Sequence, residues 1–315
     1  MLLKYIPAKL FSWVRITRIQ FYPMPWIAYS LGAMAAFNTI GEFNLKIYWV
    51  GYLAVFFIEV CTVLANEYND ITTDKINKNQ GFFNGGSQVL IEGKLELKTV
   101  KKAIFILLFV VFCLAIFLLY ISPVSCKIPI LFLLSAGLFF GLGYSIPPLK
   151  FSYRGAGEIV VGLTTCPLVI VCGYTFQSGS LKSPFPLMLS IPMFFAMLAA
   201  ITLSGVPDTF ADRAVSKRTW AVIFGPRRAT LISAFFVSLA ALVFILGYFL
   251  SLIHFFPAIF IPVVLFHAFF LLYALFKLWR SNSFNKKING IMALALFYVP
   301  WFGLIPFLSL FVNKR

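Results

Sequence analysis

Charged side chains are scarce in this chain of 315 residues, where Asp, Glu, Lys and Arg together make up only 11%. Soluble domains carry about 25% charged residues, whereas this chain is 61% hydrophobic and has a mean hydropathy of +0.93. The shortage excludes an ordinary soluble domain and predicts a membrane protein. Because each crossing takes roughly 20 residues, we expect one membrane domain over residues 1–315.

Histidine and cysteine are also few. The two histidines are His254 and His267, and none of the five cysteines forms a CxxC pair. This pattern excludes a zinc site of the usual Cys/His spacing and a disulfide framework. We interpret the cysteines as small buried apolar residues and assign neither histidine a catalytic role.

Acidic residues number 10 against 26 basic ones, a net charge of +16. The excess could indicate nucleic-acid binding, but the basic residues stand in short loops between apolar runs, where membrane topology and anionic lipid headgroups account for them. We therefore expect membrane lipid, and no nucleic acid, as a partner. The basic start of the chain, 1–20, is predicted as an interfacial segment and not as a signal peptide.

The apolar runs predict an all-α fold, a polytopic membrane bundle of nine transmembrane helices. Most of the basic residues fall on one side if the N-terminus is cytoplasmic, which favours an N-in/C-out orientation. The loops 75–99 and 213–228 would then be cytoplasmic. The predicted helices cover residues 21–40, 47–74, 100–121, 128–146, 157–177, 185–212, 229–252, 255–277 and 288–311.

Aspartate occurs at only four positions, in the two segments "DITTD" and "DTFAD". Residues four apart on a helix are neighbours on one face, so each pair of like charges repels unless a cation is present. Both predicted helices run toward the same side. Carboxylates and the amide oxygen of Asn66 suit Mg²⁺, which shares its coordination with phosphate. We predict a Mg²⁺–diphosphate site at Asp70, Asp74, Asp208 and Asp212; solvated helix ends are the alternative.

A third polar stretch, "GYSIPPLKFSYRGAGE", is predicted on the same side of the membrane. Its two prolines end a helix. Beyond them, Lys150 and Arg154 could donate to a phosphate or could serve only to set topology, and the sequence leaves both open. Tyr144 brings a hydroxyl group to the same region.

These stretches together resemble the UbiA superfamily of intramembrane aromatic prenyltransferases. Its NxxxDxxxD signature is matched by Asn66, Asp70 and Asp74, and its DxxxD signature by Asp208 and Asp212. The following "RAVSKRTWAVIFG" and the segment "YSIPPLK" are also similar to family motifs. Glu67, Asn69 and Ser216 depart from the family pattern without changing the predicted ligand positions.

The resemblance implies nine helices around a central cavity, with Mg²⁺ and a polyprenyl diphosphate at its capped cytoplasmic end. It implies that Asn66 and the four aspartates bind metal, with the aspartates as the catalytic residues. Substrate contacts are expected from Asn66, Arg18, Lys150, Tyr144, Arg154, Arg213 and Lys217, and from the cap loop 75–99 through Asn84, Ser87 and Gln88.

The resemblance further implies transfer of the prenyl group to a lipophilic aromatic acceptor. The segment "GGSQVLIEG" is most similar to the menaquinone-type branch, which prenylates 1,4-dihydroxy-2-naphthoate. Acceptors of the 4-hydroxybenzoate, haem or glycerol-phosphate lipid type are the alternatives, and an ion-coupled transporter is the alternative from another class. Glu59 and Glu158, both predicted within the membrane, are candidate proton acceptors; salt bridges to neighbouring helices are the alternative. We expect a prokaryotic cell membrane.

Overall fold

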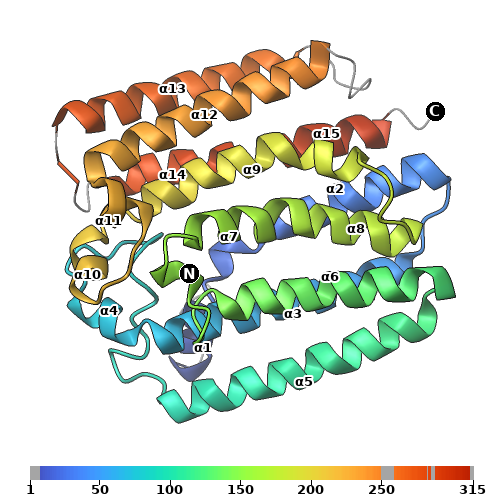
Figure 1. Ribbon diagram of the computed structural model, residues 1–315, viewed down its shortest axis with the longest axis horizontal. Coiled ribbons are helices and arrows are strands. Elements are labelled where there is room, and N and C mark those ends of the chain that lie inside the picture. The colour runs from blue at the N-terminus through green and yellow to red at the C-terminus, as the bar shows by residue number, and fades with distance from the viewer. Residues whose placement is uncertain (1–7, 250–258, 282, 285–287, 313–315) are drawn as a thin grey trace.

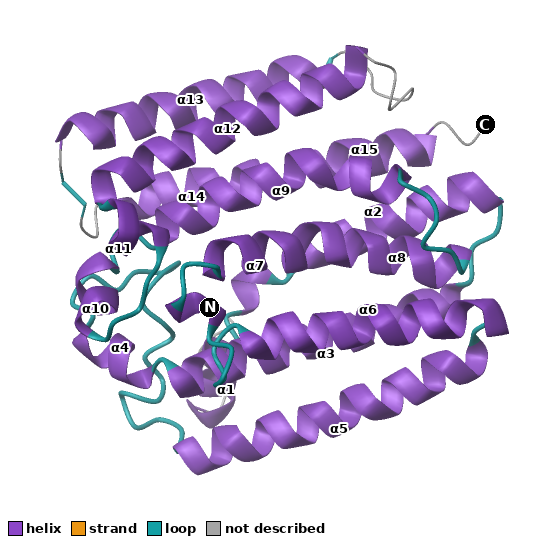
Figure 2. Ribbon diagram, in the orientation of Figure 1, coloured by secondary structure: helices purple, strands orange, loops and turns teal. Residues whose placement is uncertain are grey.

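Every regular element in the described residues is a helix (Figure 2). The structure is a computed structural model and describes residues 8–249, 259–281, 283–284 and 288–312. The long helices lie side by side along the longest axis (Figure 1). A bilayer core offers no water to satisfy exposed backbone groups, so helices that satisfy their own are favoured there. The predicted all-α fold class is confirmed.

By length and composition, eight helical stretches of the described residues could cross a membrane, which makes the chain an integral membrane protein. Six consist of one unbroken helix, and two are subdivided. The stretches are α3 (Leu45–Asn69), α5 (Leu97–Ile121), α6 (Val124–Gly143), α7 with η4 and α8 (Gly157–Ser178), α9 (Phe185–Ser204), α12 (Pro226–Phe249), α13 (Phe260–Ser281), and α14 with α15 (Asn289–Val312).

The first of the nine predicted crossings corresponds to α2 (Pro23–Ile40), which is not among these eight apolar stretches. This helix lies inside the bundle, where small residues take the place of large apolar ones. A Cβ atom on Gly32 would collide with the backbone of Ile170 in α8, and one on Gly173 would collide with the backbone of Tyr29. Close contact between helix backbones, rather than contact with lipid, explains the composition of α2.

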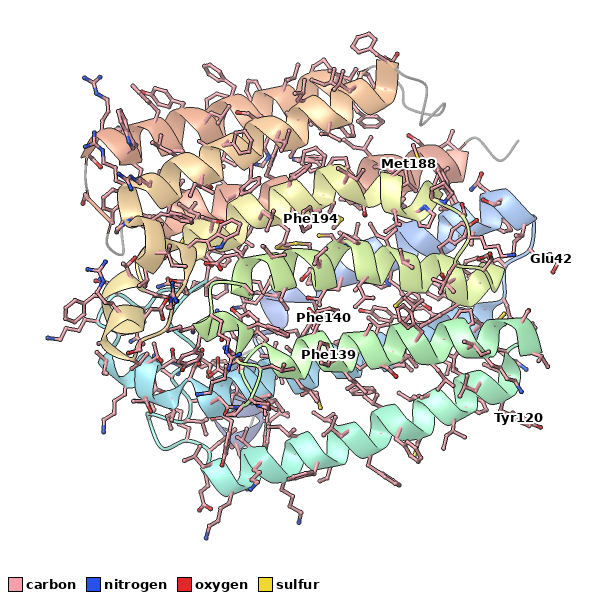
Figure 3. The ribbon with its side chains drawn as sticks, viewed as in Figure 1. Glu42, Tyr120, Phe139, Phe140, Met188 and Phe194 are labelled. Atoms are coloured by element: carbon pink, nitrogen blue, oxygen red, sulfur yellow. The ribbon has the colours of Figure 1, made fainter. Side chains whose placement is uncertain are left out.

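The helix α5, at one edge of the bundle (Figure 1), shows the opposite composition. Its side chains include Phe105, Phe109 and Phe112, which are all exposed, and Tyr120 projects from its far end (Figure 3). Large apolar side chains without a protein neighbour are expected where a helix faces lipid. The two helices therefore differ in what they contact: α2 packs small residues against α8, whereas α5 presents large apolar side chains outward.

Two predicted helices are broken where we expected them to be continuous. The predicted helix 47–74 ends as α3 at Asn69 and resumes as α4 (Ile71–Ile76). The predicted helix 185–212 ends as α9 at Ser204 and resumes as α10 (Thr209–Ala214). The second break contains Pro207, which disfavours helix at the residue before it. The first break is at Asp70, whose ψ of 7° departs from helical values.

Other predicted helices keep their place with altered ends. The predicted helix 157–177 consists of α7 (Gly157–Leu163), a π-helical turn η4 (Thr164–Leu168) and α8 (Val169–Ser178). Pro167 lies in the π-helical turn and lacks the amide hydrogen that a regular helix would use. The last stretch is divided into α14 (Asn289–Tyr298) and α15 (Trp301–Val312). The predicted break between the seventh and eighth helices lies outside the described residues.

The short elements gather at one end of the bundle (Figure 1). The N-terminal helix α1 contacts the cap loop there, through an ion pair of 2.8 Å between Arg15 Nη1 and Glu92 Oε2. That end therefore joins the start of the chain to the loop that follows α4. The short elements are α1 (Ala8–Ile16), η2 (Ile19–Phe21), α4, η3 (Phe151–Tyr153), α10 and α11 (Trp220–Phe224).

Candidate active site

The four aspartates, far apart in the chain, line one cavity of about 330 Å³. Asp70 and Asp208 each stand just before a short helix, α4 and α10, and these two helices contact each other at the same end of the bundle (Figure 1). Neither carboxylate caps the helix that follows it, so both remain available to the cavity. Other predicted residues in the cavity wall are Arg18, Asn66, Asn84, Tyr144 and Lys217.

Beyond the aspartates the cavity continues between apolar walls. The helices α3, α6, α7 and α9 supply most of them, and Phe140 of α6, labelled in Figure 3, is one of the aromatic residues. Such a wall can bury a hydrocarbon chain, at roughly 25 cal/mol for each Å² of apolar surface removed from water. The cavity therefore joins an acidic end to an apolar interior.

Asp70 is balanced by a cation from the loop after the second pair. Lys217 Nζ lies 2.7 Å from Asp70 Oδ2 and 3.8 Å from Asp212 Oδ1. The hydroxyl group of Tyr153 donates to Asp70 Oδ1 at 3.0 Å. Lys217 thus lies between the two pairs and contacts both.

Asp208 is held by neutral donors from the cap loop. Asn77 Nδ2 and Asn84 Nδ2 donate to Asp208 Oδ1 at 2.7 and 2.5 Å, and the Gly85 amide donates to Asp208 Oδ2 at 3.2 Å. Asp212 accepts a hydrogen bond of 3.2 Å from Thr219 Oγ1. Sequence reasoning missed Asn77 and Thr219, because nothing in their spacing separates them from other loop residues.

The cap loop is anchored by Glu67, one of the departures from the family pattern. Its carboxylate accepts the Ser87 amide at 2.9 and 3.0 Å and the Ser87 hydroxyl group at 2.5 Å. The anchored loop places Gly86, with a φ of +68°, directly against Asp74, so that a Cβ atom there would meet the carboxylate. A glycine is required here because both the conformation and the space exclude a side chain.

Burial destabilises negative charge on the carboxylates at this acidic end. It raises the pKa of Asp74 to about 8, with Glu67 and Asp70 adding to the shift, and it raises the pKa of Asp212 to about 7 against the opposing charge of Lys217. Burial alone would lower the pKa of Lys217, but Asp70 and Asp212 outweigh it and raise the pKa. The carboxylates therefore favour a proton or a cation as partner.

The donor set is of the kind that Mg²⁺ uses. Carboxylate oxygens from two segments and the amide of Asn66 border one cavity. In the ranges that the structure covers, no group of three acidic, histidine or cysteine side chains could hold an ion unaided. Mg²⁺ is commonly held by one or two carboxylates together with phosphate oxygens and water. The two aspartate pairs fit this chemistry, because a metal ion bound between them would complete its coordination with oxygens from a phosphate ligand.

Five predicted contact residues lie away from the cavity wall. The Lys150 ammonium lies over the ring of Tyr153, 4.5 Å from its centroid, and Arg154 donates to the Pro148 carbonyl. Arg213 is exposed. Ser87 is held by Glu67, and Gln88 Nε2 donates to the Gly85 carbonyl at 2.7 Å. None of these five residues is among those that line the cavity, and substrate contact by them stays a prediction.

The remaining polar residues considered in the sequence analysis form hydrogen bonds within the protein. Arg18 Nη2 donates to the Phe83 carbonyl of the cap loop at 3.1 Å, and Asn66 Oδ1 accepts from Ser145 Oγ at 2.8 Å. Of the histidines, His267 bonds to Leu294 and Trp301, and His254 lies outside the described residues.

A helical membrane bundle whose cavity joins two aspartate pairs to an apolar interior has the architecture of an intramembrane prenyltransferase. The model of the UbiA prenyltransferase family matches residues 26–297, and the chain belongs to this family. The chain is therefore a prenyltransferase enzyme, rather than the ion-coupled transporter that was the alternative.

Relatives and solved structures agree with this assignment. The human UbiA prenyltransferase domain-containing protein 1 is 27% identical over 284 residues, 88% of this chain and 78% of the relative. A UbiA homologue from Archaeoglobus fulgidus, bound to GPP and Mg²⁺, superimposes with a TM-score of 0.64 at 16% identity, covering 95% of this chain and 99% of the other. A digeranylgeranylglyceryl phosphate synthase gives a TM-score of 0.61 at 18% identity, with coverage of 96% and 99%. The two structures share the fold.

Proposed function

We propose that this enzyme transfers a polyprenyl group from its diphosphate to a hydroxylated aromatic acceptor within the membrane, with Mg²⁺ as the cofactor. The supporting observation is the convergence of both aspartate pairs on one cavity whose remaining wall is apolar. A diphosphate needs charge compensation and a prenyl chain needs an apolar wall, and this cavity offers both at adjoining positions. The Archaeoglobus homologue that binds GPP and Mg²⁺ has the same fold.

Asn66, Asp70, Asp74, Asp208 and Asp212 would hold the metal. When bound, Mg²⁺ supplies positive charge that stabilises a departing diphosphate. Arg18 and Lys217 border the same end of the cavity and would add cationic hydrogen bonds to phosphate oxygens. The Tyr144 hydroxyl group, also in the wall, can donate to the same ligand.

The chain's own groups also exclude water from the reacting atoms. The cap loop covers the acidic end through Asn77, Asn84 and Gly85. In a site without water, interactions with developing charge become stronger. An allylic carbon that gains positive charge as the diphosphate leaves would therefore meet the acceptor before it meets solvent.

The acceptor we favour is an aromatic quinone precursor of the 1,4-dihydroxy-2-naphthoate kind, as the cap-loop segment "GGSQVLIEG" indicates. The second candidate is a glycerol-phosphate lipid, supported by the shared fold of the digeranylgeranylglyceryl phosphate synthase. We further propose nine crossings, with α2 as the ninth, an N-in/C-out orientation and a cytoplasmic acidic end. A prokaryotic cell membrane stays a prediction.

The test uses purified full-length protein in lipid nanodiscs with Mg²⁺, a prenyl diphosphate and each candidate acceptor, with products identified by mass. Product is expected from at least one acceptor and is lost on chelation of the metal. Asp70→Ala and Asp208→Ala should each lower the rate about 1,000-fold.

The matched control is Glu42→Gln, because Glu42 is exposed at the opposite end of the bundle (Figure 3); it should keep the full rate. Unchanged transfer in both aspartate variants would overturn the proposed function.

A further inference from the structure

Glu59 stands in the middle of α3, a membrane-spanning helix, and lines the cavity. An ionisable side chain at that depth is costly unless it has a partner or a function. The described residues offer its carboxylate no hydrogen bond and no ion pair within bonding distance. The hydroxyl groups of Tyr22 and Tyr52 lie close enough to interact with it electrostatically, and that of Tyr22 already donates to the Thr17 carbonyl. The Glu59 carboxylate is free to bind a ligand.

Glu158, the other glutamate predicted as a proton acceptor, is engaged differently. Glu158 also lines the cavity, but its Oε1 accepts the Trp220 amide at 2.6 Å, and its Oε2 is buried without a hydrogen-bond partner. Trp220 begins α11, directly after the loop that carries Lys217 and Thr219 to the aspartates. Glu158 therefore positions that loop, and the structure separates the two glutamates by their contacts.

The place of Glu59 in the cavity indicates what it would bind. It precedes Asn66 by two helical turns on the same face of α3, about 10 Å along the helix axis, and both residues line the cavity. The cationic residues of the wall, within the described residues, are Arg18 and Lys217. Arg18 bonds to the cap loop and Lys217 to Asp70, so both belong to the acidic end. The Glu59 end has a carboxylate without a cation, which suits a hydrogen-bond donor and repels an anion.

We propose that Glu59 is a catalytic residue that accepts the hydroxyl proton of the acceptor, and that the acceptor is therefore a phenol or an aromatic diol. This inference rests on the proposed function. The hydroxyl group would be directed to Glu59, and any carboxylate on the ring would be directed away from it, toward Arg18. A porphyrin without a ring hydroxyl group would leave Glu59 without its partner.

The step balances as follows. The hydroxyl proton passes to the Glu59 carboxylate as a ring carbon forms a bond to the allylic carbon C1. The bond between C1 and the diphosphate oxygen breaks, and its electron pair leaves with the diphosphate. The resulting ring ketone regains aromaticity when its ring proton is lost and its oxygen is protonated. One proton remains on Glu59 and is released after each turnover.

The experiment compares the full-length protein with Glu59→Gln on a series of 1-naphthols of increasing hydroxyl acidity. Glu59→Gln is expected to slow transfer about 100-fold or more with the least acidic naphthol, the usual size of a lost proton acceptor. The defect should shrink steadily as the hydroxyl group becomes more acidic, because an acceptor that ionises by itself needs less help. The KM for the prenyl diphosphate should stay within twofold of the wild-type value.

Glu158→Gln is the matched comparison, since it removes the same charge from the same cavity wall. A positioning residue should lower the rate by the same factor for every naphthol. Glu59→Gln keeps the shape of the side chain, and an unchanged unfolding temperature in detergent would show that it folds.

A wild-type rate in Glu59→Gln, or a defect of equal size across the naphthol series, would overturn the assignment of Glu59. These results would leave the proposed function standing, provided that Asp70→Ala and Asp208→Ala still lower transfer about 1,000-fold. Retained transfer in those aspartate variants would overturn the proposed function itself.

Discussion

The two aspartate segments share a backbone pattern but are completed by different partners. Asp70 and Asp208 each precede a helix of six residues. Asp70 is neutralised by Lys217, from the loop that follows the second pair, whereas Asp208 is held by amide donors from the loop that follows the first pair. The first aspartate of each pair is thus held by the loop after the other pair. The site exists only when both halves of the chain fold together.

This difference predicts different consequences when one partner is removed. Lys217 carries a full charge to a carboxylate whose side chain is 4% exposed, whereas Asn77 is one of several neutral donors to Asp208. Breaking a buried ion pair costs more than losing one neutral hydrogen bond, because the remaining charge is left without a partner.

Among the variants that remove a partner of an aspartate, Lys217→Met is expected to have the largest effect. It leaves Asp70 buried without its cation, at a cost of about 3 kcal/mol to the metal-free protein, and should lower prenyl transfer about 100-fold. Thermal unfolding in detergent without metal measures the first effect, and initial rates measure the second. Lys217→Arg keeps the charge and should retain most of the stability. An unchanged unfolding temperature for Lys217→Met would show that the ion pair does not stabilise the site.

A second prediction concerns the pH dependence of metal binding. With pKa values of about 8 for Asp74 and about 7 for Asp212, both carboxyl groups hold protons at pH 6 that a metal must displace. Affinity should therefore rise by about 500-fold between pH 6 and 8 and level off near pH 9. Mn²⁺ binding followed by electron paramagnetic resonance measures it. A flat profile would mean that these two carboxylates do not bind the metal.

The smallest effect is expected for Asn77→Ala. Asp208 keeps Asn84 and the Gly85 amide as donors, so the loss of one hydrogen bond, about 1.5 kcal/mol, should raise the KM for the prenyl diphosphate about tenfold. The unfolding temperature without metal should change less than in Lys217→Met. A larger loss of stability in Asn77→Ala than in Lys217→Met would reverse the comparison between the two pairs.

The aspartate segments also show how far prediction from sequence reaches. The spacing of each pair and its place at the end of an apolar run were sufficient to predict that all four carboxylates meet. The breaks that convert the predicted helix ends into α4 and α10 were not predicted. Pro207 could have indicated the second break, but the break at Asp70 contains no proline or glycine. This break could be found only from the tertiary structure, because the chain turns there toward residues that are distant in the sequence.

The basic residues teach the same lesson. Lys150, Arg154, Arg213 and Lys217 were all predicted to contact substrate, and among these four only Lys217 lines the cavity. Sequence places all four near the same side of the membrane, because topology depends on position along the chain. Which of these four cationic groups lies 2.7 Å from Asp70 depends on how the loop after α10 folds. Glu158 helps to position that loop through its hydrogen bond with the Trp220 amide.

By itself, the sequence determined the membrane class, the succession of apolar helices, the two aspartate pairs and the family, because hydropathy and motif spacing are properties of neighbouring residues. Only the tertiary structure decided that Asp70 is held by Lys217, from the loop after the second pair, and that Asp208 is held by Asn77, from the loop after the first. It also decided that Glu158 is hydrogen-bonded while Glu59 is free. These contacts join residues distant in the chain, and their geometry depends on how helices and loops pack, which local pattern does not specify.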